Sequence, residues 1–203
     1  MRRTAFCFLA TVFCTPAWAA DLTVSVKTLA GKPVRDAVVS VYPDAGSAGA
    51  SRLAGPFRVT QQNLQFDPFV LVVQAGTDVS FPNRDAVRHH VYSFSPANRF
   101  ELRLYGKDET RTVRFDKVGV VALGCNIHDQ MVAFVKVVDT PFAAKTGENG
   151  EAVVRGLPAG GATMHVWHPY AKVAKNEIER RIASPRESVS FDLRIPPERR
   201  GGY

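Results

Sequence analysis

Short segments in which apolar and polar side chains alternate recur along almost the whole chain after residue 20, and they limit the possible folds most strongly. Clear examples are residues 22–26, 100–104 and 111–115. A period of two turns alternate side chains of a strand toward a core and toward water. Turn-forming glycines and prolines separate the segments at close spacing, which is typical of a sandwich or Greek key. We therefore expect an all-β protein.

The first 19 residues differ from this pattern and predict a secretory signal peptide. Arg2 and Arg3 precede an apolar run over residues 5–13, and Ala17 and Ala19 supply the small residues of a cleavage site. We expect cleavage after residue 19 or 20 and a periplasmic location. Beyond the signal, no apolar stretch approaches the ~20 residues of a membrane span, so we expect no integral membrane segment after signal removal.

Removal of the signal takes away two of the three cysteines, so that only Cys125 remains, and lowers the formal net charge from +7 to about +5. An exported chain with one cysteine has no internal disulfide. Its thiol is then either occupied, for example by a metal, or buried and inert. The positive charges are scattered through strand-like segments rather than gathered in one run. Together with export, this argues against nucleic acid as a partner.

The strongest chemical signal is the spacing Cys125-x-x-His128-x-x-Met131 between two strand-like segments. A thiolate, an imidazole and a thioether suit a soft transition metal, and His89 or His90 upstream can supply a fourth ligand. Two histidines, one cysteinate and a weak axial methionine define a blue-copper site, whereas zinc sites usually lack methionine. The sequence therefore predicts one type 1 copper ion.

The central part of the chain resembles the cupredoxins, amicyanin more than plastocyanin. The resemblance rests on residues 66–68, 71–83 and 83–89 and on the short His-to-Met spacing. It implies a Greek-key cupredoxin β-sandwich over residues 57–139. In that family the upstream ligand is followed by Asn and an apolar residue, which favours His89 and puts His90 in the Asn position. Alternation agrees, because His89 and Val91 share one face. The resemblance also implies that His128 passes electrons near the surface and that Met131 is axial.

Two flanking segments, residues 20–56 and 140–195, resemble a carboxypeptidase-regulatory-like, or prealbumin-like, β-sandwich. The matching motifs are residues 31–34, 146–150 and 157–160. Neither segment has enough strands alone, so we expect one smaller discontinuous sandwich of about five strands with the cupredoxin inserted in it. Residues 173–182 are expected as a helical turn or loop, and residues 196–203 as a flexible tail. His165 and His168 suggest either a second metal site or ordinary strand-end residues, and we favour the latter.

These features predict a periplasmic type 1 copper protein that acts in one-electron transfer, with a redox protein such as a periplasmic cytochrome as partner. The alternative is a copper chaperone, buffer or sensor without a redox partner. We expect no enzyme, because multicopper oxidases and nitrite reductases need further copper sites and the mature chain has only five histidines. The wider chain also resembles exported plastocyanin-like proteins labelled methylamine-utilisation proteins, a label that says little about chemistry.

Overall fold

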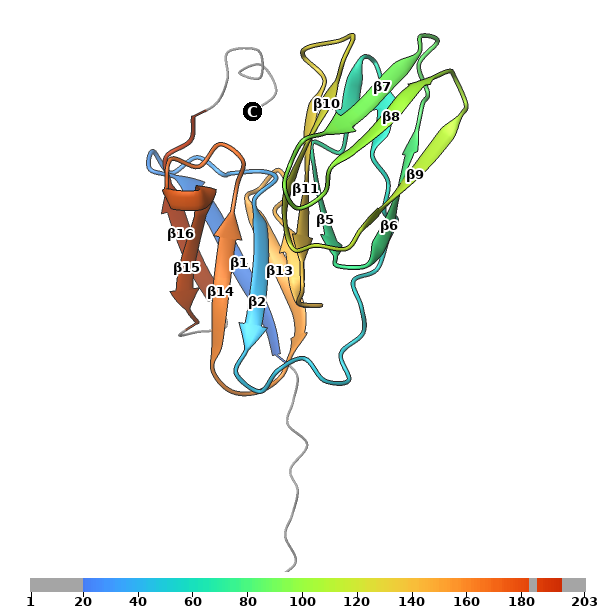
Figure 1. The fold of residues 1–203 in the computed structure, drawn as a ribbon. Coiled ribbons are helices and arrows are strands. Elements are labelled where there is room, and N and C mark those ends of the chain that lie inside the picture. The colour runs from blue at the N-terminus through green and yellow to red at the C-terminus, as the bar shows by residue number, and fades with distance from the viewer. Residues whose placement is uncertain (1–19, 183–185, 195–203) are drawn as a thin grey trace, which may run out of the picture.

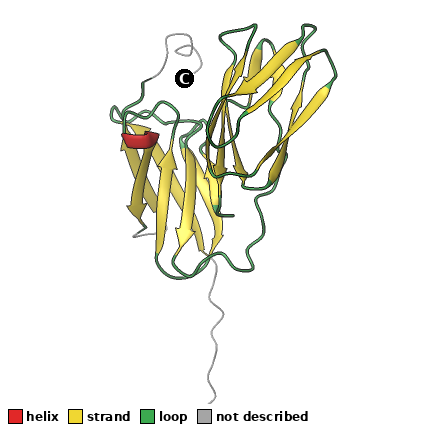
Figure 2. Ribbon diagram, viewed as in Figure 1, coloured by secondary structure: helices red, strands yellow, loops and turns green. Residues whose placement is uncertain are grey.

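The computed structural model describes residues 20–182 and 186–194, so the predicted signal peptide and tail lie outside it. The described chain is all-β, as predicted, with one 3₁₀ turn (Figure 2). None of its helices is long and apolar enough to cross a membrane. The elements are β1 Ala20–Thr28, β2 Val38–Pro43, β3 Thr60–Gln62, β4 Gln65–Asp67, β5 Val70–Gln74, β6 Thr77–Pro82, β7 His89–Ser93, β8 Phe100–Tyr105, β9 Thr110–Phe115, β10 Gly119–Cys125, β11 Val132–Val138, β12 Ala143–Lys145, β13 Glu151–Leu157, β14 Ala162–Trp167, η1 Ala174–Asn176, β15 Glu177–Arg181 and β16 Arg186–Phe191.

Strands β3 to β11 form one sandwich, which we call the central sandwich. One layer is a five-stranded sheet in the order β5-β11-β10-β7-β8, and the other contains the pairs β3-β4 and β6-β9. Isolated bridges at Ser80 and Asn83 join β6 to the β3 side. The core between the layers follows the predicted alternation, since Val91, Val121 and Leu123 are buried in it.

The remaining strands form a second sandwich, here the flanking sandwich, from both ends of the described chain. Its sheets are β13-β1-β16 and β12-β2-β14-β15, and they enclose a separate apolar core. The expected count of five strands was too low, because β12 is short and β15 was not recognised. Residues 173–182 contain a single 3₁₀ turn and then strand β15, whose pairing with β14 outweighs the charged, helix-compatible composition.

The two sandwiches meet along an apolar seam. In Figure 1 the flanking sandwich lies beside β11 and β5, whereas β7 and β8 lie on the far side of the central sandwich. The seam is built from Phe69 and Phe134 on one side and Trp167 and Tyr170 on the other, with rings in tilted and edge-to-face contact. Trp167 is accordingly buried, at 2% exposed. Aromatic pairs of this kind add about 0.5–1.5 kcal/mol each beyond their buried area.

Candidate metal centre

Three predicted ligands meet at one end of the central sandwich. His89 opens β7, Cys125 closes β10, and His128 lies in the loop that leads to β11. The Nδ1 atoms of His89 and His128 lie 3.9 and 3.7 Å from Cys125 Sγ, and the three ligand atoms all lie within 4.8 Å of one another. Metal–ligand bonds of about 2.0–2.3 Å that spread in one plane place their ligand atoms roughly 3.5–4 Å apart. The cluster therefore has room for one ion at its centre.

The cluster is buried except at His128. His89 is 0% and Cys125 3% exposed, and Met131, at 1%, lies in the same core. The Met131 amide donates a 2.9 Å hydrogen bond to the His128 carbonyl, which closes a turn between the two residues. His128 is half-buried and its neighbour Ile127 is exposed. An ion in this cluster would be shielded from water while one imidazole stays near the surface.

Alternation along β7 separates the two adjacent histidines. His89 points inward with Val91, whereas the ring of His90 lies on the outer face, where its Nε2 is 2.8 Å from Glu101 Oε1. The structure thus brings His89 into the cluster and leaves His90 out of it. The assignment of His89 as the ligand stays a prediction, and this placement supports it.

A rigid approach loop fixes where β7 begins. Asn83 is fully buried and its side-chain amide donates to the carbonyls of Val87 and Tyr105, at 2.9 and 3.1 Å. Its side-chain oxygen accepts a hydrogen bond from the Asp85 amide. These contacts join the loop to the end of β8, so the position of His89 does not depend on the loop backbone alone.

Asp85 braces His89 and was not identified from the sequence. Its Oδ2 lies 2.7 Å from His89 Nε2. Because Nδ1 faces the cysteine, Nε2 is the nitrogen that donates a hydrogen bond to the carboxylate. Both carboxylate oxygens also accept backbone N–H bonds from Asn63 and Leu64, at the tip of the β3-β4 hairpin. A carboxylate behind a metal-binding histidine fixes the ring and raises its basicity. An acid four residues before a histidine is too common a pattern to have revealed this.

The charge state of Asp85 follows from the same contacts. Burial pushes the pKa of the carboxyl upward, but the hydrogen bonds from His89 and from the two hairpin amides outweigh it, so its pKa lies below the usual range. Leu64 makes its contact with Asp85 from a left-handed backbone conformation, φ 56°, which is rare for a bulky residue. Asp85 is therefore an anion held in a fixed place beside His89.

A second buried polar group supports β8 opposite His89. Tyr105 pairs with His89 across β7 and β8, is almost fully buried, and donates from its hydroxyl to the Phe81 carbonyl at 2.9 Å. The hydroxyl also accepts a hydrogen bond from the Gln61 side chain. Burial raises the pKa of Tyr105 to about 12, so the phenol stays neutral at physiological pH.

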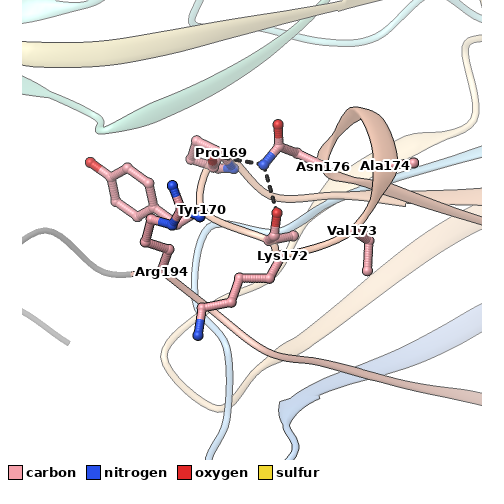
Figure 3. Close-up of a pocket in the computed structure, with 8 residues that line it drawn as sticks. Pro169, Tyr170, Lys172, Val173, Ala174, Asn176 and Arg194 are labelled. Carbon is pink, nitrogen blue, oxygen red and sulfur yellow. Dashed lines mark hydrogen bonds between the residues drawn. The ribbon is translucent and has the colours of Figure 1, made fainter.

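His165 and His168 do not form a comparable cluster among the described residues. His165 Nδ1 lies 3.0 Å from Glu177, and His168 is buried in the flanking sandwich. A surface pocket of about 520 Å³ lies nearby (Figure 3), lined by Pro169, Tyr170, Ala171, Lys172, Val173, Ala174, Asn176 and Arg194. The Asn176 amide is satisfied by the Pro169 and Ala171 carbonyls. The two buried polar atoms without a hydrogen-bond partner in the described chain, Gln61 Oε1 and His90 Nδ1, do not line this pocket. The pocket also lies apart from the cluster.

No family model and no curated protein matches this sequence. Among solved structures, the chain is similar to a purple cupredoxin from Nitrosopumilus maritimus, with 20% identity and a TM-score of 0.36 over 40% of this chain and 98% of that one. It is similar to a Cu(I) mutant of amicyanin, with 20% identity and a TM-score of 0.38 over 49% and 98%. It is also similar to a copper-containing nitrite reductase from Thermus scotoductus SA-01, with 24% identity and a TM-score of 0.39 over 57% of this chain and 28% of the enzyme.

The donor set itself decides the metal. One thiolate and two imidazole nitrogens converge, and a buried thioether lies in the same core. A structural zinc site would close with a fourth Cys, His or carboxylate, and among the described residues no such group joins this cluster. This is a blue-copper donor set. The residues fit one type 1 copper ion.

Proposed function

We propose that this protein is an exported carrier of single electrons, with copper bound by His89, Cys125, His128 and Met131. The observation that carries the proposal is the convergence of both imidazole Nδ1 atoms on the buried Cys125 sulfur. Bound copper would alternate between Cu(II) and Cu(I). The residues of the chain would hold the ligands in place and provide the path for the electron.

The strands hold the ligands in place during a change of charge. Cys125 pairs with Val91 across β10 and β7, and Asp85 and Asn83 fix the loop before His89. A site whose ligands keep their positions in both oxidation states needs little reorganisation energy for each electron transfer. A buried, tightly held thiolate also opposes the ready release of copper that a chaperone or buffer requires, which favours the electron carrier over that alternative.

His128 is the proposed exit for the electron. It is the ligand with partial exposure, and Ile127 beside it and Val87 near His89 are exposed apolar residues. A small apolar surface at a redox centre suits brief contact with a redox protein, for which we propose a periplasmic cytochrome. The described residues hold one cluster of this kind, so we propose a carrier rather than a multicopper enzyme.

We further propose the domain boundaries that the sequence predicts, residues 57–139 for the copper domain and residues 20–56 with 140–195 for the discontinuous flanking domain. Two separate apolar cores support this division. Residues 1–19 would direct export and be removed, and the mature protein would act in the periplasm.

The deciding experiment is copper reconstitution of the mature apoprotein beside Cys125→Ser. We expect one copper per chain and an intense thiolate-to-copper charge-transfer band in the parent, and neither the band nor its type 1 paramagnetic signature in the variant. A stable, reversible reduction potential and rapid electron exchange with a cytochrome distinguish a carrier from a chaperone. A parent that binds copper without the visible band would disprove the proposal.

A further inference from the structure

The outer face of the five-stranded sheet is only half covered. On β5 and β11 the outward side chains Val72 and Phe134 pack into the seam, and Lys136 forms a 2.6 Å ion pair with Glu177 of β15. At the start of β10 Val120 also packs against the seam, whereas the later part of β10 and strand β7 lie beyond the flanking sandwich (Figure 1). Ala122 is exposed there, and Phe94 is 69% exposed although it is a large aromatic residue.

The uncovered half is aromatic and reaches the backbone beside Cys125. Tyr92 pairs with Gly124, the residue before Cys125, and its ring lies so close that a Cβ on Gly124 would meet it at 2.8 Å. The Tyr92 ring contacts the Phe94 ring at a centroid distance of 5.0 Å. A chain of contacts therefore runs from the Cys125 strand to an exposed ring. Glycine at position 124 is what permits this approach.

The border of this surface is positively charged. The Arg99 guanidinium lies 5.2 Å from the centre of the Phe94 ring, a cation–π contact that keeps the charge at the surface. Arg103 is also exposed, and within the described chain neither arginine takes part in an ion pair. The carboxylate between them, Glu101, is already engaged by His90. Two arginines stand against this one carboxylate, so the formal charge around the two aromatic rings is net positive.

We infer that this surface, formed by Tyr92, Phe94, Arg99 and Arg103, docks an acidic electron-transfer protein at a second place, apart from the surface at His128, since a carrier exchanges electrons with both a donor and an acceptor. The arginines would attract carboxylates of the partner, Phe94 would supply the buried apolar contact, and Tyr92 would bring the partner against the strand that ends in Cys125. An exposed aromatic residue next to arginine is the composition of an interface centre. The inference rests on the proposed electron transfer, because only a redox partner gains from contact with this strand.

The test uses the copper-loaded mature protein and an acidic c-type cytochrome, with electron exchange followed by stopped flow at several salt concentrations. We expect Arg99→Glu and Arg103→Glu to lower the second-order rate constant by about tenfold at low salt, because rim charges act mainly on the association rate. Phe94→Glu should lower it at least as much. The salt dependence should weaken in both arginine variants.

Matched controls carry the same changes elsewhere. Lys117→Glu places the same charge change in the loop between β9 and β10, and Leu29→Glu alters another exposed large apolar residue, in the flanking sandwich. Both should react like the parent. The visible band and potential of every variant are recorded first, so a parent without the band refutes the copper proposal alone. Blue variants that react at the parent rate, or a rate loss found only with Ile127→Glu, would overturn the docking surface and leave the copper proposal intact.

Discussion

The two sandwiches each bury one histidine completely, and the two histidines have opposite surroundings. His168 of the flanking sandwich accepts a hydrogen bond from the Tyr170 amide at Nδ1, 3.2 Å away, and its ring also hydrogen-bonds the Arg35 backbone. His89 has a carboxylate at Nε2, but its Nδ1 faces the Cys125 sulfur at 3.9 Å. A buried imidazole with backbone partners is structural, whereas one that turns a nitrogen toward other soft donors is prepared for a metal.

Removal of the His89 imidazole should have the largest effect, because it takes away the metal-facing nitrogen that distinguishes His89 from His168. We expect His89→Ala to lower copper affinity by well over a hundredfold and to abolish the visible band, since even outer contacts of metal sites are worth 10–100-fold. His90→Ala is the matched control and should keep the band, because His90 lies on the outer face. Copper titration with visible and paramagnetic resonance spectra measures both. A blue His89→Ala and a colourless His90→Ala would reverse the assignment of the ligand.

The next largest effect is expected from acid acting on His168. Burial lowers the pKa of His168 to about 4, against opposing effects of Asp36 and of the bond to Arg35. The unfolded chain therefore binds the proton first, near pH 6.5. The stability due to neutral His168 is full above that pH and decreases toward pH 4, by about 3 kcal/mol at most.

Urea unfolding of the apoprotein between pH 7 and pH 4 measures this decrease. His168→Phe replaces the imidazole with an apolar ring beside Phe191 and should remove the His168 part of the pH dependence, whatever its effect on stability at neutral pH. An unchanged slope in the variant would show that His168 is not the group that titrates.

A smaller change is expected when the brace behind His89 loses its charge. Asp85→Asn keeps a hydrogen-bond acceptor but removes the anion, so we expect Cu(II) to be destabilised relative to Cu(I). The ratio of the two affinities should change about tenfold, which is about 59 mV in a one-electron potential, upward. Cyclic voltammetry measures it, with Asp108→Asn as an exposed control. A potential that is unchanged or lower would show that the brace does not tune the site.

The smallest effect concerns the contact between the sandwiches. Lys136 pairs with Glu177 and lies 5.5 Å from the centre of the Trp167 ring. Burial raises the pKa of Glu177, but its bonds to Lys136 and His165 outweigh this and lower it overall. We expect Lys136→Met to cost about 1 kcal/mol in the free energy of unfolding.

The exposed pair of Arg181 and Asp44 provides the control for this measurement. Arg181→Met should leave the free energy of unfolding almost unchanged, since water screens an exposed pair. Denaturant unfolding followed by both tryptophan fluorescence and circular dichroism should give coincident transitions in the parent. Separate transitions in the parent would show that the seam does not couple the two sandwiches.

The ligand loop could be predicted because its evidence is local. Cys125, His128 and Met131 lie within seven residues, and alternation along one strand was enough to prefer His89 over His90. The brace could not be predicted, because Asp85 gains its role only where the β3-β4 hairpin delivers the amides of Asn63 and Leu64. Strand β15 was missed for a similar reason, since its pairing with β14 is what makes a charged segment extended.

By itself, the sequence determined the class of fold and the chemical identity of the donors, because side-chain period and the spacing of Cys125, His128 and Met131 are properties of neighbouring residues. Tertiary structure alone decided which nitrogen of His89 faces the cysteine, what holds its other nitrogen, and which half of the five-stranded sheet remains uncovered. Those outcomes depend on contacts between strands far apart in the chain. Such contacts form only when the two cores pack and bring their surfaces together.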